Sequence, residues 1–362
     1  MRKSILLLII CVVWTNVQAQ SANAVADEKL NGFLETAKVP GLSISVSQKG
    51  ELIYSKGFGY ADLEKQTPVD PSSTKFRIGS VSKTLTAAGL ARLYQEGKID
   101  LDVSIKKYVP IWPEKEGTIT LRQLGGHLAG IRHYRSGEFY SDRNYPTVTD
   151  GLGIFINDSL INTPGTEYSY SSYGWNLIAA AMEGAYGGGT FLQTADFLQY
   201  MQQNVFDALK MENTVAEYVN ESIPNLTSFY ESQNDKVINA HFVDNSYKWA
   251  GGGFVGTTED LCLFGQAHMK AGFLNQEVLD EWMASQKTTD GKLTNYGIGW
   301  LTFNRPSGRV YYGHSGGSVG GTTYFLIHKE SETVLAITAN LSPLDYNGIQ
   351  FDLMDLFINN DN

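Results

Sequence analysis

The chain has 362 residues, a formal net charge of -10 at pH 7 and 12% aromatic residues. The excess of acidic groups argues against binding to nucleic acids or anionic membranes. The aromatic and glycine-rich composition argues against disorder. The length suits one large domain or two lobes, given typical domains of about 100 to 200 residues. These properties favour a soluble enzyme or binding protein.

The first nineteen residues are typical of a secretory signal peptide. Two basic residues precede an apolar run over 4–14, and the segment closes with Val17-Gln18-Ala19. The run is shorter than the roughly 20 residues that a spanning helix needs. We expect cleavage after this segment, export to the periplasm or the extracellular space, and no membrane contact after signal removal. We do not expect lipid anchoring at Cys11, because the bulky Ile10 precedes it.

Strand patterns lie at both ends of the remaining chain, residues 20–362. Alternating apolar residues over 42–46 and 51–55 predict an antiparallel hairpin. Further strands are predicted over 309–312, 322–328 and 333–338, and helices over 82–95, 175–183, 194–209 and 258–268. This order predicts an α+β fold. An antiparallel sheet built from both termini, about 39–79 and 290–362, would flank a helical lobe over about 85–289.

The stretch Gly-His-Ser-Gly-Gly-Ser-Val-Gly-Gly over 313–321 contains Gly-x-Ser-x-Gly twice, centred on Ser315 and Ser318. In some hydrolases this pattern holds the nucleophile between a strand and a helix, and an acid and a histidine follow it. Here β-prone residues follow, and no acid lies between either serine and the next histidine, His328. Neither serine is expected to attack a substrate.

Ser80 is a better candidate nucleophile, because Ser80-x-x-Lys83 opens a predicted amphipathic helix. This spacing places the hydroxyl and the amine on one face. Serine needs a base, and a buried lysine can be one because burial disfavours the ammonium. The segments 72–75 and 104–107 match the same pattern, but only Ser80 follows a glycine at the start of a long apolar helix. The alternative is a helix-capping serine beside a solvated lysine.

Two further elements favour a catalytic interpretation. Tyr170 follows a Pro-Gly turn just before a predicted helix, where its phenol could pass a proton if nearby lysine cations lower its pKa. The alternative is a packed aromatic residue, since the chain has 20 tyrosines. His314-Ser315-Gly316 lies on a β-prone segment, and the following glycines would let a substrate approach the backbone closely.

Together these elements resemble the signatures of the serine β-lactamase-like family, which includes class C β-lactamases, penicillin-binding proteins and related esterases and peptidases. They occur in family order as Ser80-x-x-Lys83, Tyr170-Ser171-Ser172 and His314-Ser315-Gly316. The resemblance extends from Val39 to Asn340. The stretches 79–86, 126–134 and 243–254 are most similar to the peptidase-like branch found in vertebrate mitochondria. The resemblance implies a β-lactamase/transpeptidase-like fold and a serine hydrolase.

The resemblance also implies roles for individual residues. Ser80 would be the acylated nucleophile, with Lys83 and Tyr170 as the proton-transfer pair. The backbone N–H groups of Ser80 and Gly317 would form the oxyanion hole. Substrate contacts would come from Ser172, Gly316 and His314, and His314 would line the cleft and hydrogen-bond the substrate or Tyr170.

Two departures from the family pattern bear on the substrate. Ser172 replaces a common asparagine, so one hydroxyl donor stands where an amide offers two. His314 stands where penicillin-hydrolysing members usually have lysine, and histidine is mostly neutral at pH 7. We therefore expect weak or no β-lactamase activity and hydrolysis of a small peptide, D-amino-acid amide or ester. A true β-lactamase, a D,D-carboxypeptidase and a self-assembling scaffold are the alternatives, the last because the vertebrate branch forms filaments.

The other histidines, cysteines and glycines predict no cofactor. His127 is expected to be a hydrogen-bonded core residue. The sequence contains neither His-Glu-x-x-His nor a cysteine cluster, so no metal site is predicted. Cys262 is the one cysteine outside the signal segment, so no intramolecular disulfide is expected. The glycines over 251–253 lack a dinucleotide-binding context and predict tight packing or a cleft wall.

Overall fold

The computed structural model describes residues 22–187 and 196–359, so the predicted signal peptide lies outside the described residues. Seven strands form one sheet in the order β3-β2-β1-β12-β11-β10-β9, with antiparallel neighbours throughout. Their bounds are β1 Gly41–Gln48, β2 Glu51–Asp62, β3 Thr67–Pro68, β9 Leu301–Asn304, β10 Val310–Ser318, β11 Gly321–His328 and β12 Thr333–Ala339. Because β1 pairs with β12, the sheet joins the two ends of the chain, as predicted.

The central strand β1 is buried on both faces, although its sequence alternates apolar residues with serines. The apolar side chains face one layer. On the other face, the hydroxyls of Ser43 and Ser45 lie 2.7 and 2.8 Å from that of Thr258, and Ser47 accepts a hydrogen bond from Gln266. Both partners belong to helix α8, Thr258–Gln266. Sequence order predicts that α8 lies in the helical lobe. Its contacts with the serines of β1 show instead that it packs against the sheet.

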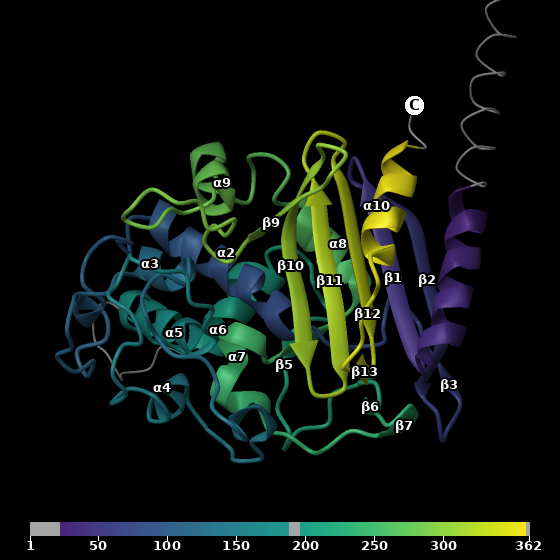
Figure 1. Cartoon of the computed structure of the whole chain (residues 1–362), viewed down its shortest axis with the longest axis horizontal. Helices are drawn as coiled ribbons and strands as arrows, with labels where there is room; N and C mark the ends of the chain where they lie inside the picture. Colours follow the sequence, from purple (N-terminus) through teal and green to yellow (C-terminus); the bar gives the residue numbers. More distant parts are fainter. Residues whose placement is uncertain (1–21, 188–195, 360–362) are drawn as a thin grey trace, which may run out of the picture.

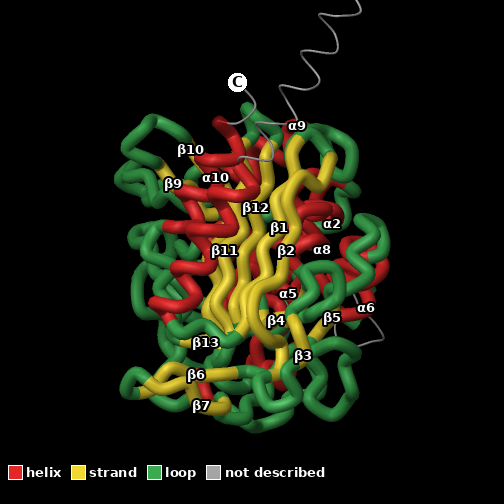
Figure 2. Tube along the Cα trace, turned by 90° about the vertical axis from the view of Figure 1, so that its right-hand side faces the viewer, coloured by secondary structure: helices red, strands yellow, loops and turns green. Residues whose placement is uncertain are grey.

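Two helices near the ends of the chain cover the apolar face of the sheet. Residues 22–37 are helical, and α10 spans Ile349–Asn359. Ala26 and Leu30 of the first helix and Leu353 and Phe357 of α10 pack in one buried cluster with Leu42 of β1. Figure 2 looks onto this layer. Neither helix was predicted from the sequence.

The remaining helices lie beside the end of the sheet formed by β10 and β9 (Figure 1). They are α2 Ser82–Gln95, α3 Leu121–Gly125, α4 Val148–Leu152, α5 Tyr173–Tyr186, α6 Phe197–Met201, α7 Trp249–Gly252 and α9 Gln276–Met283. The predicted helix over 194–209 is shorter, because a π-helical turn, Gln202–Phe206, follows α6 directly. Thr194 and Ala195 lie outside the described residues.

Two small sheets connect these layers. One has the order β4-β8-β5 and the other β13-β6-β7. Their bounds are β4 Phe76–Arg77, β5 Val215–Ala216, β8 Phe254–Gly256, β6 Tyr230–Gln233, β7 Lys236–Asn239 and β13 Leu341–Ser342. The first sheet holds the segment that enters α2, since the N–H of Ile78 donates to the carbonyl of Phe254.

Helix α2 is almost wholly buried, so the expectation of an amphipathic helix is wrong. Its polar residues are hydrogen-bonded inside the protein instead of facing water. The hydroxyl of Thr84 donates to the carbonyl of Val81, and that of Thr86 donates to the carbonyl of Ala250. Such bonds remove much of the cost of burying a hydroxyl. The burial places the lysine at the start of this helix inside the protein.

Within residues 22–187 and 196–359, no helix combines the length and apolarity needed to cross a membrane. The thiol of Cys262 is free and buried.

Candidate active site

Ser80 lies in a tight turn against the last residues of β10. The 3₁₀ turn η1, Gly79–Val81, leads directly into α2. A Cβ on Gly79, whose φ is +50°, would lie 2.7 Å from the backbone N of Gly317. A Cβ on Gly316 would lie 2.0 Å from the carbonyl oxygen of Ile78. Only glycine allows the two backbones to approach this closely. Gly317 is therefore held beside Ser80, while Gly316 packs against the turn.

Lys83 is fully buried beneath Ser80. Its Nζ lies 3.0 Å from Oγ of Ser80, 3.1 Å from Oγ of Ser172 and 2.5 Å from the carbonyl oxygen of Gly251. No carboxylate of the described residues forms an ion pair with this amine. Three polar atoms thus surround Nζ, and one of them is the hydroxyl of the candidate nucleophile.

The protonation of Lys83 follows from these surroundings. Burial and the nearby positive charge of Lys248 hold the pKa of the Lys83 amine well below its usual value. A neutral amine has two N–H donors and one lone pair. It can donate to Ser172 and Gly251 and accept the proton of the Ser80 hydroxyl. The arrangement suits a lysine that acts as a general base.

Tyr170 contacts the same hydroxyl from the other side. Its phenol donates a hydrogen bond of 2.8 Å to Oγ of Ser80. Burial raises the pKa of Tyr170, so the phenol is protonated at neutral pH. The expectation that lysine cations lower the pKa of Tyr170 is therefore wrong, because loss of solvation dominates. In the free enzyme, Lys83 is the base and Tyr170 is an acid.

Two histidines before α5 hold the segment that carries Tyr170. Nδ1 of His127 accepts a hydrogen bond of 3.1 Å from the backbone N–H of Ser171, and Nδ1 of His133 accepts one of 3.2 Å from that of Ser172. His127 is buried, as expected from the sequence. His133 reaches the cleft and was not predicted there.

His314 does not take the position that the sequence suggested. It is 2% exposed, its Nε2 lies 2.9 Å from the hydroxyl of Tyr296, and its Nδ1 lies 2.5 Å from the carbonyl oxygen of Ser315. Because Nδ1–H donates to that carbonyl, Nε2 accepts the proton of Tyr296. Burial lowers the pKa of His314 to about 3, so the ring is neutral. A hydrogen bond to the substrate or to Tyr170 was expected, and no bond to Tyr170 is formed, since both ring nitrogens are engaged elsewhere.

A cleft of about 480 Å³ opens in front of Ser80. It is lined by Ser80, His133, Tyr134, Phe139, Tyr140, Ser172, Lys248, Gly251, Gly252, Gly317, Ser318, Thr322, Ser342, Pro343 and Leu344. Gly251 and Gly252 of the predicted cleft wall line it, whereas Gly253 packs against Trp249 and Asn245. Lys248 was missed, although one sequence signal was available. Lys248 stands between two aromatic residues, in Tyr247-Lys248-Trp249.

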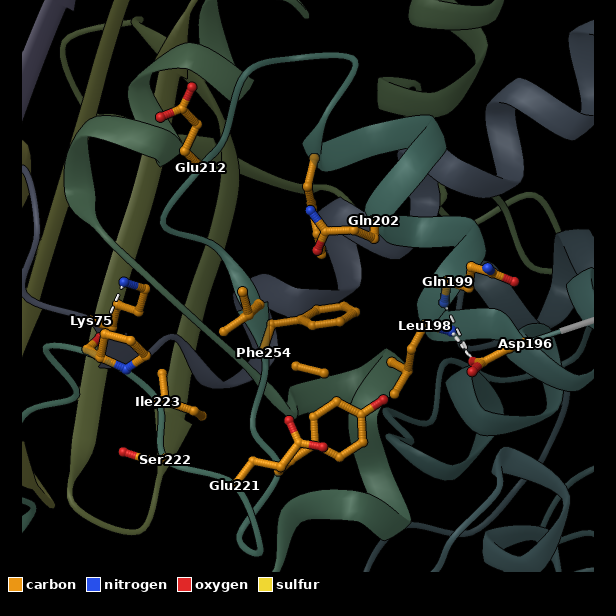
Figure 3. Close-up of a pocket in the computed structure, with 15 residues that line it drawn as sticks. Lys75, Asp196, Leu198, Gln199, Gln202, Glu212, Glu221, Ser222, Ile223 and Phe254 are labelled. Atoms are coloured by element: carbon orange, nitrogen blue, oxygen red, sulfur yellow. Dashed lines mark hydrogen bonds between the residues drawn. The ribbon is translucent and has the colours of Figure 1, made fainter.

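A second cavity, of about 510 Å³, lies away from these residues. Lys75 lies at one end of it and Asp196 at the other (Figure 3). Nζ of Lys75 donates to Asn213 and to the carbonyl of Pro224. None of the residues of the three motifs lines this cavity, although it is the larger of the two.

The third Ser-x-x-Lys match is structural. Ser104 precedes the 3₁₀ turn η2, Ile105–Lys107, and its side chain accepts a hydrogen bond from the backbone N–H of Lys106. This is the role of a helix cap. Among the described residues, no group of three or more His, Cys, Asp or Glu side chains is arranged to hold a metal ion.

Comparison with known proteins places this geometry in a family. The family model described as Beta-lactamase matches residues 26–356. Human serine beta-lactamase-like protein LACTB, mitochondrial, is 30% identical over 87% of this chain and 73% of its own length. The fold is similar to an octameric penicillin-binding protein homologue from Pyrococcus abyssi, with a TM-score of 0.79, 22% identity and coverage of 93% of this chain and 77% of that one.

A further similar structure is the D-amino acid amidase from Ochrobactrum anthropi SV3 complexed with D-phenylalanine. It has a TM-score of 0.75 and 22% identity, and the match covers 93% of this chain and 98% of that one. These structures confirm the β-lactamase/transpeptidase-like fold. Since the family model spans nearly the whole described chain, the protein belongs to the β-lactamase family and is a serine hydrolase of it.

Proposed function

We propose that the protein hydrolyses amide or ester bonds of small peptide-like substrates through an acyl-enzyme on Ser80. The observation that carries this proposal is the position of the Ser80 hydroxyl. It lies 3.0 Å from the buried amine of Lys83 and 2.8 Å from the phenol of Tyr170. A base and an acid on opposite sides of one hydroxyl that lines the cleft are the groups that acyl transfer requires.

In the acylation step, Oγ of Ser80 attacks the substrate carbonyl and its proton moves to Nζ of Lys83. The negative charge that develops on the carbonyl oxygen would be held by the backbone N–H groups of Ser80 and Gly317. Both residues line the cleft, and their backbones are held in contact by the glycines described above. Losing one such donor typically lowers turnover by about 10² to 10³.

In the second half of acylation, the bond to the leaving group breaks and Tyr170 gives its proton to the departing nitrogen or oxygen. The phenolate then recovers a proton from the Lys83 ammonium. Water attacks the acyl-enzyme with Lys83 as base, and Ser80 is released with its proton restored. The protonated phenol and the neutral amine of the free enzyme match these two roles.

Weak or absent β-lactamase activity is part of the proposal. A β-lactam carries a carboxylate, and the lysine usual at position 314 would bind it. Here the residue is a buried, neutral histidine whose two nitrogens are engaged. The amidase named above was solved with D-phenylalanine, which favours amides of D-amino acids as substrates to test first.

Steady-state hydrolysis of D- and L-phenylalanine amides, 4-nitrophenyl esters and nitrocefin tests the proposal, with Ser80→Ala as the blank. We expect turnover of at least one amide or ester that disappears in Ser80→Ala, and little turnover of nitrocefin. Turnover of nitrocefin far above that of every amide and ester would make the protein a β-lactamase. Turnover by Ser80→Ala equal to that of the parent would show that Ser80 is not the nucleophile.

Export remains a proposal that rests on residues 1–19. N-terminal sequencing of the protein recovered from its native cells is expected to begin at Gln20. An intact Met1 would contradict it.

Self-assembly is also proposed, because one structure similar to this chain is described as octameric. Size-exclusion chromatography with light scattering is expected to give a mass well above that of the monomer. A fully active protein with the mass of a monomer would contradict the proposed self-assembly.

A further inference from the structure

A second buried lysine, Lys248, lies in the cleft without an acidic partner. It is 2% exposed and immediately precedes α7. Its Nζ lies 4.4 Å from the ring centre of Phe139, 5.1 Å from that of Tyr247 and 5.7 Å from that of Tyr134. Aromatic faces attract a cation but do not neutralise it. Within the part of the chain that the structure describes, no carboxylate forms an ion pair with it.

Glu217, the acidic residue that attracts Lys248 electrostatically, already forms an ion pair with Arg77. Glu217 attracts the ammonium, but its carboxylate is bound by Arg77 at 2.6 Å and accepts a further hydrogen bond from Asn245. Arg77 and Glu217 are both buried, so they form a neutral pair. Burial and the charge of Arg77 lower the pKa of Lys248 to about 7, so the amine is only partly protonated near neutral pH, and its positive charge has no internal counterpart.

Lys248 stands beside the reacting groups. A Cβ on Gly252 would lie 3.7 Å from Cδ of Lys248 and 3.8 Å from the carbonyl carbon of Gly79, the residue before Ser80. The lysine therefore lies just across the glycine wall from the candidate nucleophile. Lys248 and Ser80 line the same cleft, and Ser172 lines it too.

A buried cation without a partner is unfavourable, and an anion that enters the same site offsets that cost. We propose that Lys248 binds a carboxylate of the substrate, which makes this enzyme selective for acidic peptides, amides or esters. The proposal rests on the proposed hydrolase function. In this proposal the substrate carboxylate is bound by Lys248, next to Gly251 and Gly252, and not by the residue at position 314 of β10, which here is a neutral histidine.

Lys248 also has an electrostatic effect on catalysis that must be separated from substrate binding. Its charge helps to keep Lys83 unprotonated. Loss of that effect alters the hydrolysis of charged and neutral substrates alike. Loss of a carboxylate site lowers kcat/KM only for the charged substrate, so the ratio between matched substrates identifies the role.

Two matched ester pairs provide the test. The first pair is 4-nitrophenyl hydrogen glutarate and its methyl ester, which differ in charge on the acyl side. The second is 4-carboxyphenyl acetate and its methyl ester, which differ on the leaving-group side. The ratio of kcat/KM within each pair is measured near neutral pH for the parent, Lys248→Gln, Lys248→Met and Lys270→Gln. Lys270 is a surface lysine, with 78% of its side chain exposed, and serves as the charge-matched control.

We expect the parent to prefer the charged member of at least one pair. Both Lys248 variants are expected to lower that ratio by about tenfold or more, as for removal of one partner of a buried charge pair. Lys270→Gln is expected to keep the parental ratio. An unchanged ratio in Lys248→Gln overturns the proposal. So does a parent without preference in either pair, which needs no variant to fold.

Ser80→Ala on the same four esters separates this inference from the proposed function. If Ser80→Ala hydrolyses them as well as the parent, the proposed function fails. If it is inactive while the Lys248 variants keep the parental ratio, the hydrolase stands and the carboxylate site does not.

Discussion

The same four-residue pattern occurs at Ser72–Lys75 and at Ser80–Lys83, only a few residues apart, and the two regions differ completely. Ser72 is exposed and its hydroxyl donates to Asp70. Lys75 turns away from it to Asn213 and Pro224, at the edge of the larger cavity. In the second region, the serine and the lysine contact each other.

The charges around the two lysines differ as well. Burial lowers the pKa of Lys75, but the carboxylate of Asp260 opposes this effect. Burial also lowers the pKa of Lys83, and there the neighbouring charge, on Lys248, acts in the same direction. The pattern alone therefore does not make a base. A base results where the lysine is buried, lacks an acid and lies within hydrogen-bonding distance of the serine.

The largest expected difference between the two regions is in the serines. Ser80→Ala removes the attacking atom, so kcat/KM for an active ester is expected to fall by roughly 10⁴ or more, to background. Ser72→Ala removes an exposed hydroxyl and is expected to keep parental activity. Initial rates with 4-nitrophenyl acetate check both. A comparable fall in kcat/KM in Ser80→Ala and Ser72→Ala would contradict the assignment of Ser80 as the nucleophile.

The lysines should differ nearly as much. Lys83→Gln keeps a polar side chain but removes the base, and we expect a fall of about 10² to 10⁴ in kcat. Lys75→Gln should change kcat less than about twofold, since Lys75 contacts no residue of the cleft. Circular dichroism melting curves confirm that both variants fold. Full activity in Lys83→Gln would contradict the assignment of the base.

The close backbone contact behind Ser80 should be sensitive to a single methyl group. In Gly316→Ala, the new Cβ would meet the carbonyl oxygen of Ile78 at 2.0 Å, so β10 must move away from the turn. Displacing the oxyanion donor of Gly317 is expected to lower kcat by about 10². Gly272→Ala, where nothing lies within 4 Å of the new Cβ, is the matched control. Equal rates in the two variants would show that the contact is not needed.

The smallest expected effect is a shift of the pH profile. Lys83 acts as a base when neutral, so kcat/KM for a neutral ester falls as the pH drops through the pKa of Lys83. The positive charge of Lys248 lowers that pKa, and Lys248→Gln should therefore move the acid limb to higher pH. Arg77 and Glu217 interact electrostatically with Lys248, and His133 interacts with both lysines. All three residues are present in the parent and in Lys248→Gln, so the comparison isolates the charge of Lys248.

The pH profile is measured for the parent, Lys248→Gln and Lys270→Gln with the methyl ester of 4-nitrophenyl hydrogen glutarate. A surface charge change should leave the acid limb in place. A limb that moves to lower pH in Lys248→Gln would contradict the electrostatic account.

The fold and the family could be predicted because they depend on patterns that the chain preserves in order. Three short motifs and strands at both termini were sufficient for the antiparallel sheet and the hydrolase family. Helix α8 was expected in the helical lobe because the lobes were assigned by sequence order alone, whereas its side chains contact the serines of β1. The alternation of apolar residues and serines in β1 does not show that the serine face is also buried.

The site could be predicted only where spacing determines proximity. Ser80 and Lys83 are one helical turn apart, so their contact follows from the sequence. Lys248 and His133 reach the cleft through loops, and their positions depend on tertiary packing. For His314, the pattern identified the strand but not the direction of the ring, which Tyr296 determines.

The central claim is that a neutral, buried Lys83 activates Ser80, and covalent labelling measures it most directly. The parent, Ser72→Ala and Lys83→Gln are treated with a fluorophosphonate, and the adduct is located and timed by peptide mass spectrometry. We predict that the adduct forms on Ser80 in the parent and in Ser72→Ala at the same rate, and about 10² or more times slower in Lys83→Gln. An adduct on another serine, or labelling of Lys83→Gln at the parental rate, would contradict the account.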